Sequence, residues 1–119
     1  MKYYHILIEY VSFGRTECYF VVDIKDIDKI NKEYVEPYIC QNRFFIKGHV
    51  IQPQNIKRFL ILESERKISE IVFDKNNEIP EDILLSYTEE DLLKEPTEEL
   101  KDVTFETVMK RASFLKINC

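Results

Sequence analysis

The amino-acid sequence predicts one α+β domain over residues 1–119, with a small antiparallel β-sheet of about five strands, one crossover helix and a helical C-terminal part. A length of 119 residues is sufficient for about one domain with one hydrophobic core. Residues 1–64 contain short runs of β-branched and aromatic side chains, which are typical of strands. Residues 74–117 are acidic and space their apolar side chains as helices do, so the domain divides into a β-rich half and an acidic helical half.

The first two strands are predicted at residues 2–11 and 16–22, which are rich in β-branched and aromatic side chains. The segment between them contains Gly14, and two such runs joined by a glycine-containing turn are typical of a β-hairpin. Alternation along the second strand makes one face more apolar than the other, so we expect a sheet that is buried on one face only.

A crossover helix is predicted after Asp23, because apolar side chains recur there at spacings of three and four. The apolar residues are Ile24, Ile27, Ile30 and Tyr34. We expect this helix to end at Glu36, since the residue before a proline disfavours helical geometry and Pro37 follows.

A second hairpin is predicted around Gly48, with short strands at residues 43–47 and 49–51. Glycine at this position would supply the positive φ that a tight turn needs. Pro53 would stop the return strand, and residues 56–62 predict a further strand with alternating side chains.

The C-terminal half predicts helices. Pro80 would lie in the first turn of one helix, with an apolar stripe of Ile83, Leu84 and Tyr87. Three threonines are candidate N-caps of short helices, because their hydroxyls can accept a hydrogen bond from a first-turn amide. These threonines are Thr88, Thr97 and Thr104.

The last helix is predicted at residues 105–116 from its apolar stripe. The stripe consists of Phe105, Val108, Met109, Ala112 and Leu115. We expect Phe105 and Val108 to pack on the domain itself, whereas Phe114 and Leu115 would contact a partner, such as a second copy of the chain.

The formal net charge of −5 is unevenly distributed. Residues 74–106 carry twelve acidic and three basic side chains, a net charge of −9, and the remainder carries +4. Acidic side chains on helices of this kind usually face solvent, although either the acidic segment or the basic remainder of the chain could bind a partner. No apolar run approaches the roughly 20 residues of a membrane span, and no signal peptide is recognised, so we expect a cytoplasmic protein without membrane association.

Catalytic and cofactor motifs are not found in the sequence, so we expect no enzyme activity, no cofactor and no metal site. The two glycines lie thirty-four residues apart and cannot form a phosphate-binding loop. Three cysteines at wide spacings predict neither a disulfide framework nor a zinc site. An enzyme centred on Cys40 and His49, which a hairpin could bring together, is a further alternative. His5 lies in a strand, where we expect it to pack or to donate to a neighbour.

Basic and aromatic residues are interleaved around the second hairpin, a mixture that single-stranded nucleic acid or a small nucleotide would need. The basic residues are Arg43, Lys47, Lys57 and Arg58, and the aromatic residues are Phe44, Phe45 and Phe59. Because strand alternation buries one face, the phenylalanines are more simply interpreted as core residues. Nucleic-acid binding is therefore the alternative hypothesis.

Several segments occur in an order that resembles the N-terminal domain of bacterial proteins with a C-terminal TIR-like nucleotide-binding domain. They are YHILIEY at residues 4–10, Glu36-Pro37-Tyr38, the hairpin at residues 45–51, residues 53–61 and the DVTFE stretch at residues 102–106. The turn glycine that follows Pro-Tyr in the family is replaced by Gln41-Asn42, and asparagine tolerates the same left-handed turn.

The resemblance implies a non-enzymatic recognition or assembly module, namely the sensing or oligomerisation domain of an antiviral effector. Its partners would be a second copy, a downstream effector domain or a phage-derived protein trigger. The chain ends at Cys119, before a TIR-like domain could begin, so none of the family's nucleotide-cleaving residues has a counterpart. We expect either the N-terminal domain of a longer protein or a stand-alone relative.

Overall fold

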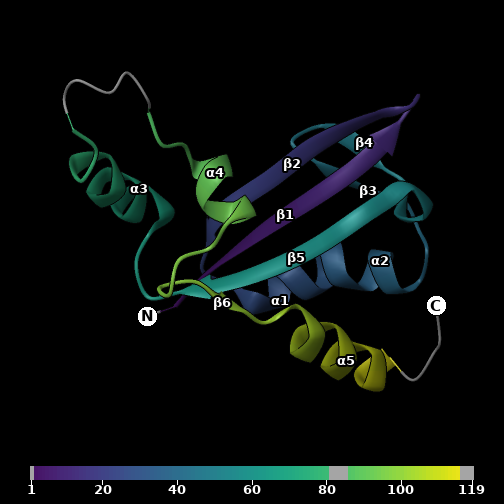
Figure 1. Ribbon diagram of the computed structural model, residues 1–119. Helices are drawn as coiled ribbons and strands as arrows, with labels where there is room; N and C mark the ends of the chain where they lie inside the picture. Colours follow the sequence, from purple (N-terminus) through teal and green to yellow (C-terminus); the bar gives the residue numbers. More distant parts are fainter. Residues whose placement is uncertain (1, 81–85, 116–119) are drawn as a thin grey trace.

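The structure is a computed structural model that describes residues 2–80 and 86–115, and it confirms the α+β class (Figure 1). A four-stranded antiparallel sheet has the order β2-β1-β5-β6, and a separate two-stranded sheet is formed by β3 and β4. In chain order the elements are β1 (Tyr3–Ser12), β2 (Arg15–Ile24), α1 (Ile27–Ile30), the π-helical turn η1 (Asn31–Val35), α2 (Glu36–Ile39), β3 (Phe44–Ile46), β4 (His49–Ile51), the 3₁₀ turn η2 (Pro53–Asn55), β5 (Ile56–Ser64), α3 (Ile68–Asn77), α4 (Glu89–Lys94), β6 (Lys101–Asp102) and α5 (Thr104–Leu115).

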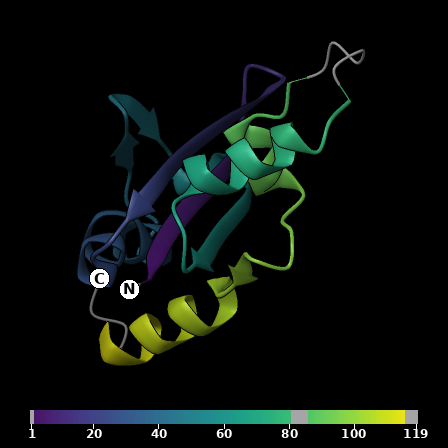
Figure 2. The same cartoon turned by 90° about the vertical axis from the view of Figure 1, so that its left-hand side faces the viewer.

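Both faces of the four-stranded sheet are covered, so the prediction of a half-buried sheet is wrong. Helices α3 and α4 cover one face, and the α1–α2 segment, the β3–β4 hairpin and α5 lie on the other side (Figures 1 and 2). The reason is visible in β1 and β5, where consecutive side chains are all buried rather than every second one. These side chains are Ile6, Leu7 and Ile8 in β1, and Phe59, Leu60, Ile61 and Leu62 in β5. Five strands before residue 64 are confirmed, but they belong to two sheets.

Both hairpins turn through two residues with positive φ. The values are 51° and 75° at Phe13 and Gly14, and 49° and 82° at Lys47 and Gly48. Two successive positive φ angles are typical of type I′ turns, which match the right-handed twist of the flanking strands. The predicted role of Gly48 is therefore confirmed.

We expect Gly48→Val to lower the free energy of unfolding by about 1–3 kcal/mol, because a β-branched residue is strongly disfavoured at positive φ. Apart from its neighbours in the chain, a Cβ atom at this position would meet no atom within 4 Å, so the cost comes from the backbone conformation and not from a clash. Urea unfolding measures the effect, with Gly48→Asn as the control, since asparagine tolerates the left-handed region. Equal stability of the valine and asparagine variants would contradict the assigned turn.

The crossover helix continues through Pro37, which corrects the predicted end at Glu36. The amide of Glu36 bonds to the carbonyl of Asn31, five residues back, so the segment before the proline is π-helical. Helix α2 then begins at Glu36, which places Pro37 in a first turn where the missing N–H costs no helical hydrogen bond. Ile24, expected in the helix, is instead the last residue of β2.

The C-terminal half is only partly as predicted. Helix α3 was not expected, because the side chain that bonds to the amide of Ile68 is distant in sequence: Asp23 Oδ1 accepts this bond at 2.8 Å. Thr88 is the N-cap of α4, as predicted, and it also forms a capping box with Asp91. Thr97 begins no helix, and the helix start predicted after Pro80 falls largely on residues outside those described.

Candidate functional site

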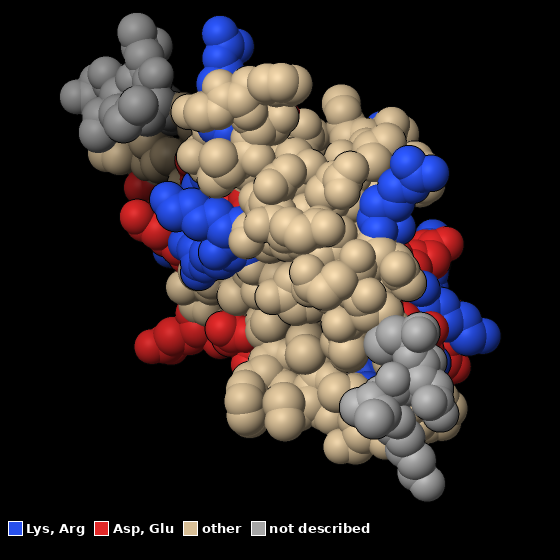
Figure 3. All heavy atoms as spheres, turned by 90° about the vertical axis from the view of Figure 1, so that its right-hand side faces the viewer, with Lys and Arg blue, Asp and Glu red and all other residues tan. Residues whose placement is uncertain are grey.

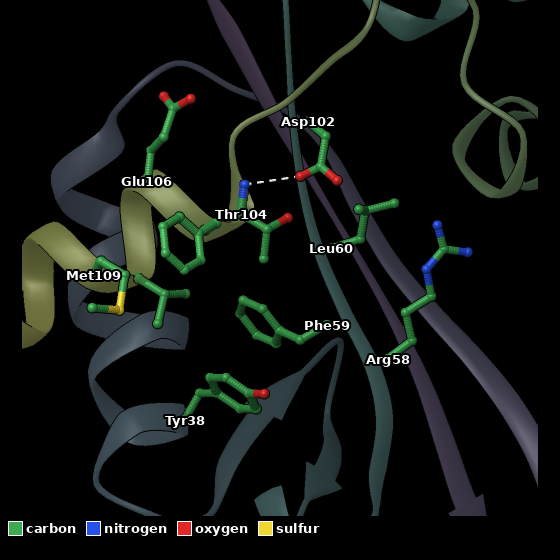
Figure 4. Close-up of a pocket in the computed structure, with 10 residues that line it drawn as sticks. Tyr38, Arg58, Phe59, Leu60, Asp102, Thr104, Glu106 and Met109 are labelled. Atoms are coloured by element: carbon green, nitrogen blue, oxygen red, sulfur yellow. Dashed lines mark hydrogen bonds between the residues drawn. The ribbon is translucent and has the colours of Figure 1, made fainter.

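A groove of about 590 Å³ lies between the outer side of β5, helix α5 and the end of α2 (Figure 4). Its walls combine apolar and charged side chains from segments that are far apart in sequence. The apolar ones are Tyr38, Phe59, Leu60, Phe105, Val108 and Met109, and the polar ones are Arg58, Asp102, Thr104 and Glu106.

The base of the groove is a pair of stacked rings. Tyr38 and Phe59 lie with ring centroids 4.4 Å apart and an interplanar angle of 11°. Phe59 is buried, whereas Tyr38 is half-buried. Tyr38 reaches this place because α2 continues past Pro37, so the position of the ring depends on the π-helical turn before it.

Helix α5 forms the opposite wall and is attached to the domain near both of its ends. At its start, the hydroxyl oxygen of Thr104 accepts a hydrogen bond from the amide of Ile61 at 2.7 Å, and the amide of Val103 donates to the carbonyl of Ile61 at 2.9 Å. About two turns later, Arg111 Nε donates to Glu36 Oε1 at 2.7 Å. The Thr104 side chain therefore connects α5 to β5 and does not act as the predicted N-cap. The backbone amide of Thr104 donates to the side chain of Asp102.

Two large apolar side chains of α5 remain open to solvent on this wall. Phe105 is 76% exposed and Met109 is 51% exposed. The expectation that Phe105 packs on the domain is therefore wrong, whereas Val108 does pack against the core. The last turn leaves Phe114 68% exposed beneath the guanidinium of Arg111, and Leu115 is half-buried.

The edge of β5 that borders the groove is open over part of its length. Strand β6 pairs only with Leu62 and Glu63, and Thr104 and Val103 satisfy the outward-facing backbone groups of Ile61. Within the described residues, no strand lies beside residues 56–60 on this side. Since outward-facing groups recur at every second residue of an antiparallel strand, the amide and carbonyl of Phe59 face the same open edge.

The four basic residues predicted as a binding site contact different elements. Arg43 is exposed in the loop before β3, and the ammonium of Lys47 lies 4.6 Å from the ring centre of Phe20 in β2. Lys57 is exposed and is the extra residue of a β-bulge, and Arg58 Nη1 lies 3.5 Å from a carboxylate oxygen of Glu9. Lys57 and Arg58 are adjacent in β5, and Arg58 alone of the four lines the groove.

The aromatic residues of the predicted nucleic-acid site divide in the same way. Phe44 and Phe59 are buried, as the core interpretation predicts, whereas Phe45 is 59% exposed opposite Val50 on the β3–β4 hairpin. The face that carries this hairpin and α2 has a broad uncharged surface, with charged side chains along its two margins (Figure 3).

The two cysteines that the structure describes, Cys18 and Cys40, offer no activated thiol near His49. Cys40 is the C-cap residue of α2 and is disulfide-bonded, so the sequence, which predicted no disulfide framework, did not reveal this bond. His49 instead packs against Tyr19, with ring centroids 4.8 Å apart and the ring planes tilted by 34°. Burial raises the pKa of the half-buried Cys18 thiol to about 11, which leaves it in the unreactive protonated form at neutral pH.

A buried polar network lies on the α3 side of the sheet and contains a serine, a histidine and an aspartate. His5 Nδ1 accepts a hydrogen bond from the backbone amide of Asp23 at 2.9 Å, and His5 Nε2 lies 2.7 Å from Ser64 Oγ. The Ser64 hydroxyl donates to the carbonyl of Arg66 at 2.6 Å. This confirms the expectation that His5 donates to a neighbour, and sequence reasoning missed Ser64 because it lies fifty-nine residues away.

The polarity of this network is opposite to that of a nucleophilic triad. An amide can only donate, so Nδ1 of His5 is the acceptor and Nε2 carries the proton that is donated to Ser64. The histidine therefore cannot accept the serine proton as a general base would. Burial lowers the pKa of His5 from 6.5 to about 4, with a smaller opposing effect of Asp23, so the ring is neutral at pH 7. The network is suited to holding the β5–α3 connection in place.

No group of three or more histidine, cysteine or acidic side chains in the described residues could hold a metal ion. Within the same residues, no helix is long and apolar enough to cross a membrane. Comparison of the chain with protein-family models, with curated proteins and with solved structures found no match.

Proposed function

We propose that the chain is a non-catalytic protein-recognition module that binds a partner protein in the groove between β5 and α5. The observation that carries this proposal is the exposure of Phe105 and Met109 on a helix that is attached near both ends. A helix held in this way cannot rotate to bury these side chains, so they remain available to a partner. Exposed apolar side chains beside a groove are typical of interaction sites.

The energetics are those of a moderate interaction. Covering two large apolar side chains would contribute roughly 3–6 kcal/mol, from which the cost of association is subtracted. The stacked pair of Tyr38 and Phe59 adds a rigid base against which a partner side chain can pack without further ordering. A docking groove with these parts favours transient recognition over a permanent complex.

The test is binding of peptides selected from a displayed library of random twelve-residue sequences on the folded chain. We expect the double variant Phe105→Ser, Met109→Ser to weaken binding of the selected peptides by about 100-fold, as loss of two interface anchors does. Isothermal titration measures the affinities. The matched control is Phe73→Ser, because Phe73 is 66% exposed on α3, outside the groove. Peptides that bind the double variant as tightly as the unchanged protein would contradict the assigned site.

The sequence resemblance extends this proposal to a biological setting. In that setting the module would act in the cytoplasm as the sensing or assembly domain of a bacterial TIR-like defence effector. The groove would receive the downstream effector domain or a phage-derived trigger, and Phe114 and Leu115 would support self-association. Two observations test the extension: whether the reading frame of the gene continues past Cys119 into a TIR-like domain, and whether light scattering detects an oligomer. A stop codon after Cys119 together with a strict monomer would contradict it.

A further inference from the structure

We infer that the segment bound in the groove is an extended stretch of a partner protein, which adds to β5 as a further strand and places a carboxylate beside Lys57 and Arg58. This inference rests on the proposed function and deepens it, since it specifies the conformation and the charge of the partner segment.

The backbone argument starts from the open edge of β5. Strand β6 pairs with β5 at Leu62 and Glu63. At Ile61 the Val103 amide and the Thr104 hydroxyl bond to the same edge of β5, and the chain then turns away from the sheet into α5. Phe59, two residues earlier, presents its amide and carbonyl in the same direction. A partner strand could therefore extend the hydrogen bonding between β5 and β6 along the edge of β5. Its main-chain hydrogen bonds would contribute affinity whatever its amino-acid sequence.

The side-chain argument follows from alternation in the added strand. On the face of the sheet that carries Phe59, every second side chain of the strand would lie over the stacked rings and beside Phe105 and Met109. These positions favour apolar side chains. The intervening side chains would lie on the opposite face, on which Arg58 and Leu60 alternate with Phe59.

Charge distinguishes a partner segment from a second copy of the chain. Lys57 and Arg58 are exposed on the free part of the edge, and Arg58 remains 43% exposed although Glu9 lies near it. If two copies of the chain paired through their β5 edges at Arg58, the Arg58 side chains of the two copies would lie opposite each other. Like charges in this position destabilise a strand pair. A segment with Asp or Glu at this position would instead gain a cross-strand ion pair.

The peptides selected on the folded chain test the inference through their sequences. We expect apolar residues at alternate positions, with an acidic residue at one of the positions between them. The variant Lys57→Glu, Arg58→Glu should weaken binding of these acidic peptides by about tenfold, the size expected for rim charges. The matched control, Arg43→Glu, reverses an exposed cation in the loop before β3 and should leave the affinity unchanged.

N-methylation of the peptides tests strand addition directly. One alternating set of peptide amides would face β5 and the other set would face away, so methylation of the first set should reduce affinity at least about tenfold and methylation of the second should be tolerated. Equal tolerance of both sets would overturn the inference. Selected peptides with apolar residues at helical spacings would also overturn the inference. If the binding of those peptides still depended on Phe105 and Met109, the proposed function would stand. A selection that yields no groove-dependent peptide would contradict both.

Discussion

Replacement of His5 by alanine is expected to lower the free energy of unfolding by about 3–5 kcal/mol, the largest effect of any single substitution considered for this protein. The ring is fully buried, so its removal leaves a cavity. It also removes the acceptor of the Asp23 amide and the donor to the Ser64 hydroxyl. Buried polar groups that lose their partners cost about 1–3 kcal/mol each, which adds to the cost of the cavity.

The chain offers a matched control for this substitution in its second histidine. His49 is exposed and packs against Tyr19 at the surface, so His49→Ala should cost less than about 1 kcal/mol. Urea unfolding followed by circular dichroism gives both values. Similar losses for the two alanine variants would show that the His5 network does not stabilise the domain.

Acidification is expected to destabilise the folded chain by as much as about 3 kcal/mol through His5 alone. Burial lowers the pKa of His5 from 6.5 to about 4, so the folded state binds a proton less readily than the unfolded state does. The contribution is complete above pH 6.5 and is lost as the pH falls from 6.5 through about 4. The main physical cause is that a charged imidazolium loses its hydration in this buried position. A protonated Nδ1 also can no longer accept the hydrogen bond from the amide of Asp23.

Unfolding free energies at several pH values between 7 and 4 would measure this dependence in the unchanged protein and in His5→Gln, which does not titrate. Carboxylates contribute to both curves, because Asp91, for example, has a pKa lowered mainly by its hydrogen bond from the Thr88 amide. The difference between the curves therefore isolates His5. Parallel curves would contradict the assigned neutral state.

The parts of the fold that the sequence predicts are those whose causes are local. Gly14 and Gly48 mark two tight turns because a two-residue turn needs positive φ there, and the flanking apolar runs identify the strands. Thr88 identifies the start of α4, since its capping partner Asp91 is only three residues away. In each case the interacting groups lie within a few residues of one another.

The groove could not be predicted, because its parts come together only through distant contacts. Its base requires Tyr38 to lie against Phe59, and its α5 wall is set by hydrogen bonds between Thr104 and Ile61 and between Arg111 and Glu36. The apolar stripe of α5 indicated a helix, but periodicity cannot say which members of a stripe the domain will cover. For this reason the stripe predicts that Phe105 packs on the domain, whereas in the structure its side chain is exposed.

The remote hydrogen bond from Ile68 to Asp23 has a consequence for the order in which the chain folds. The β1–β2 hairpin closes through a two-residue turn, and hairpins of this kind form within about 1–10 μs. Helix α3 receives its first-turn acceptor from the end of that hairpin, forty-five residues earlier, and has no side-chain cap of its own. An isolated ten-residue helix is marginal in water, so α3 would acquire stable structure only on a hairpin that already exists. During synthesis on the ribosome, the α3 segment would therefore emerge unstructured and become helical only when it packs against the completed β1–β2 hairpin.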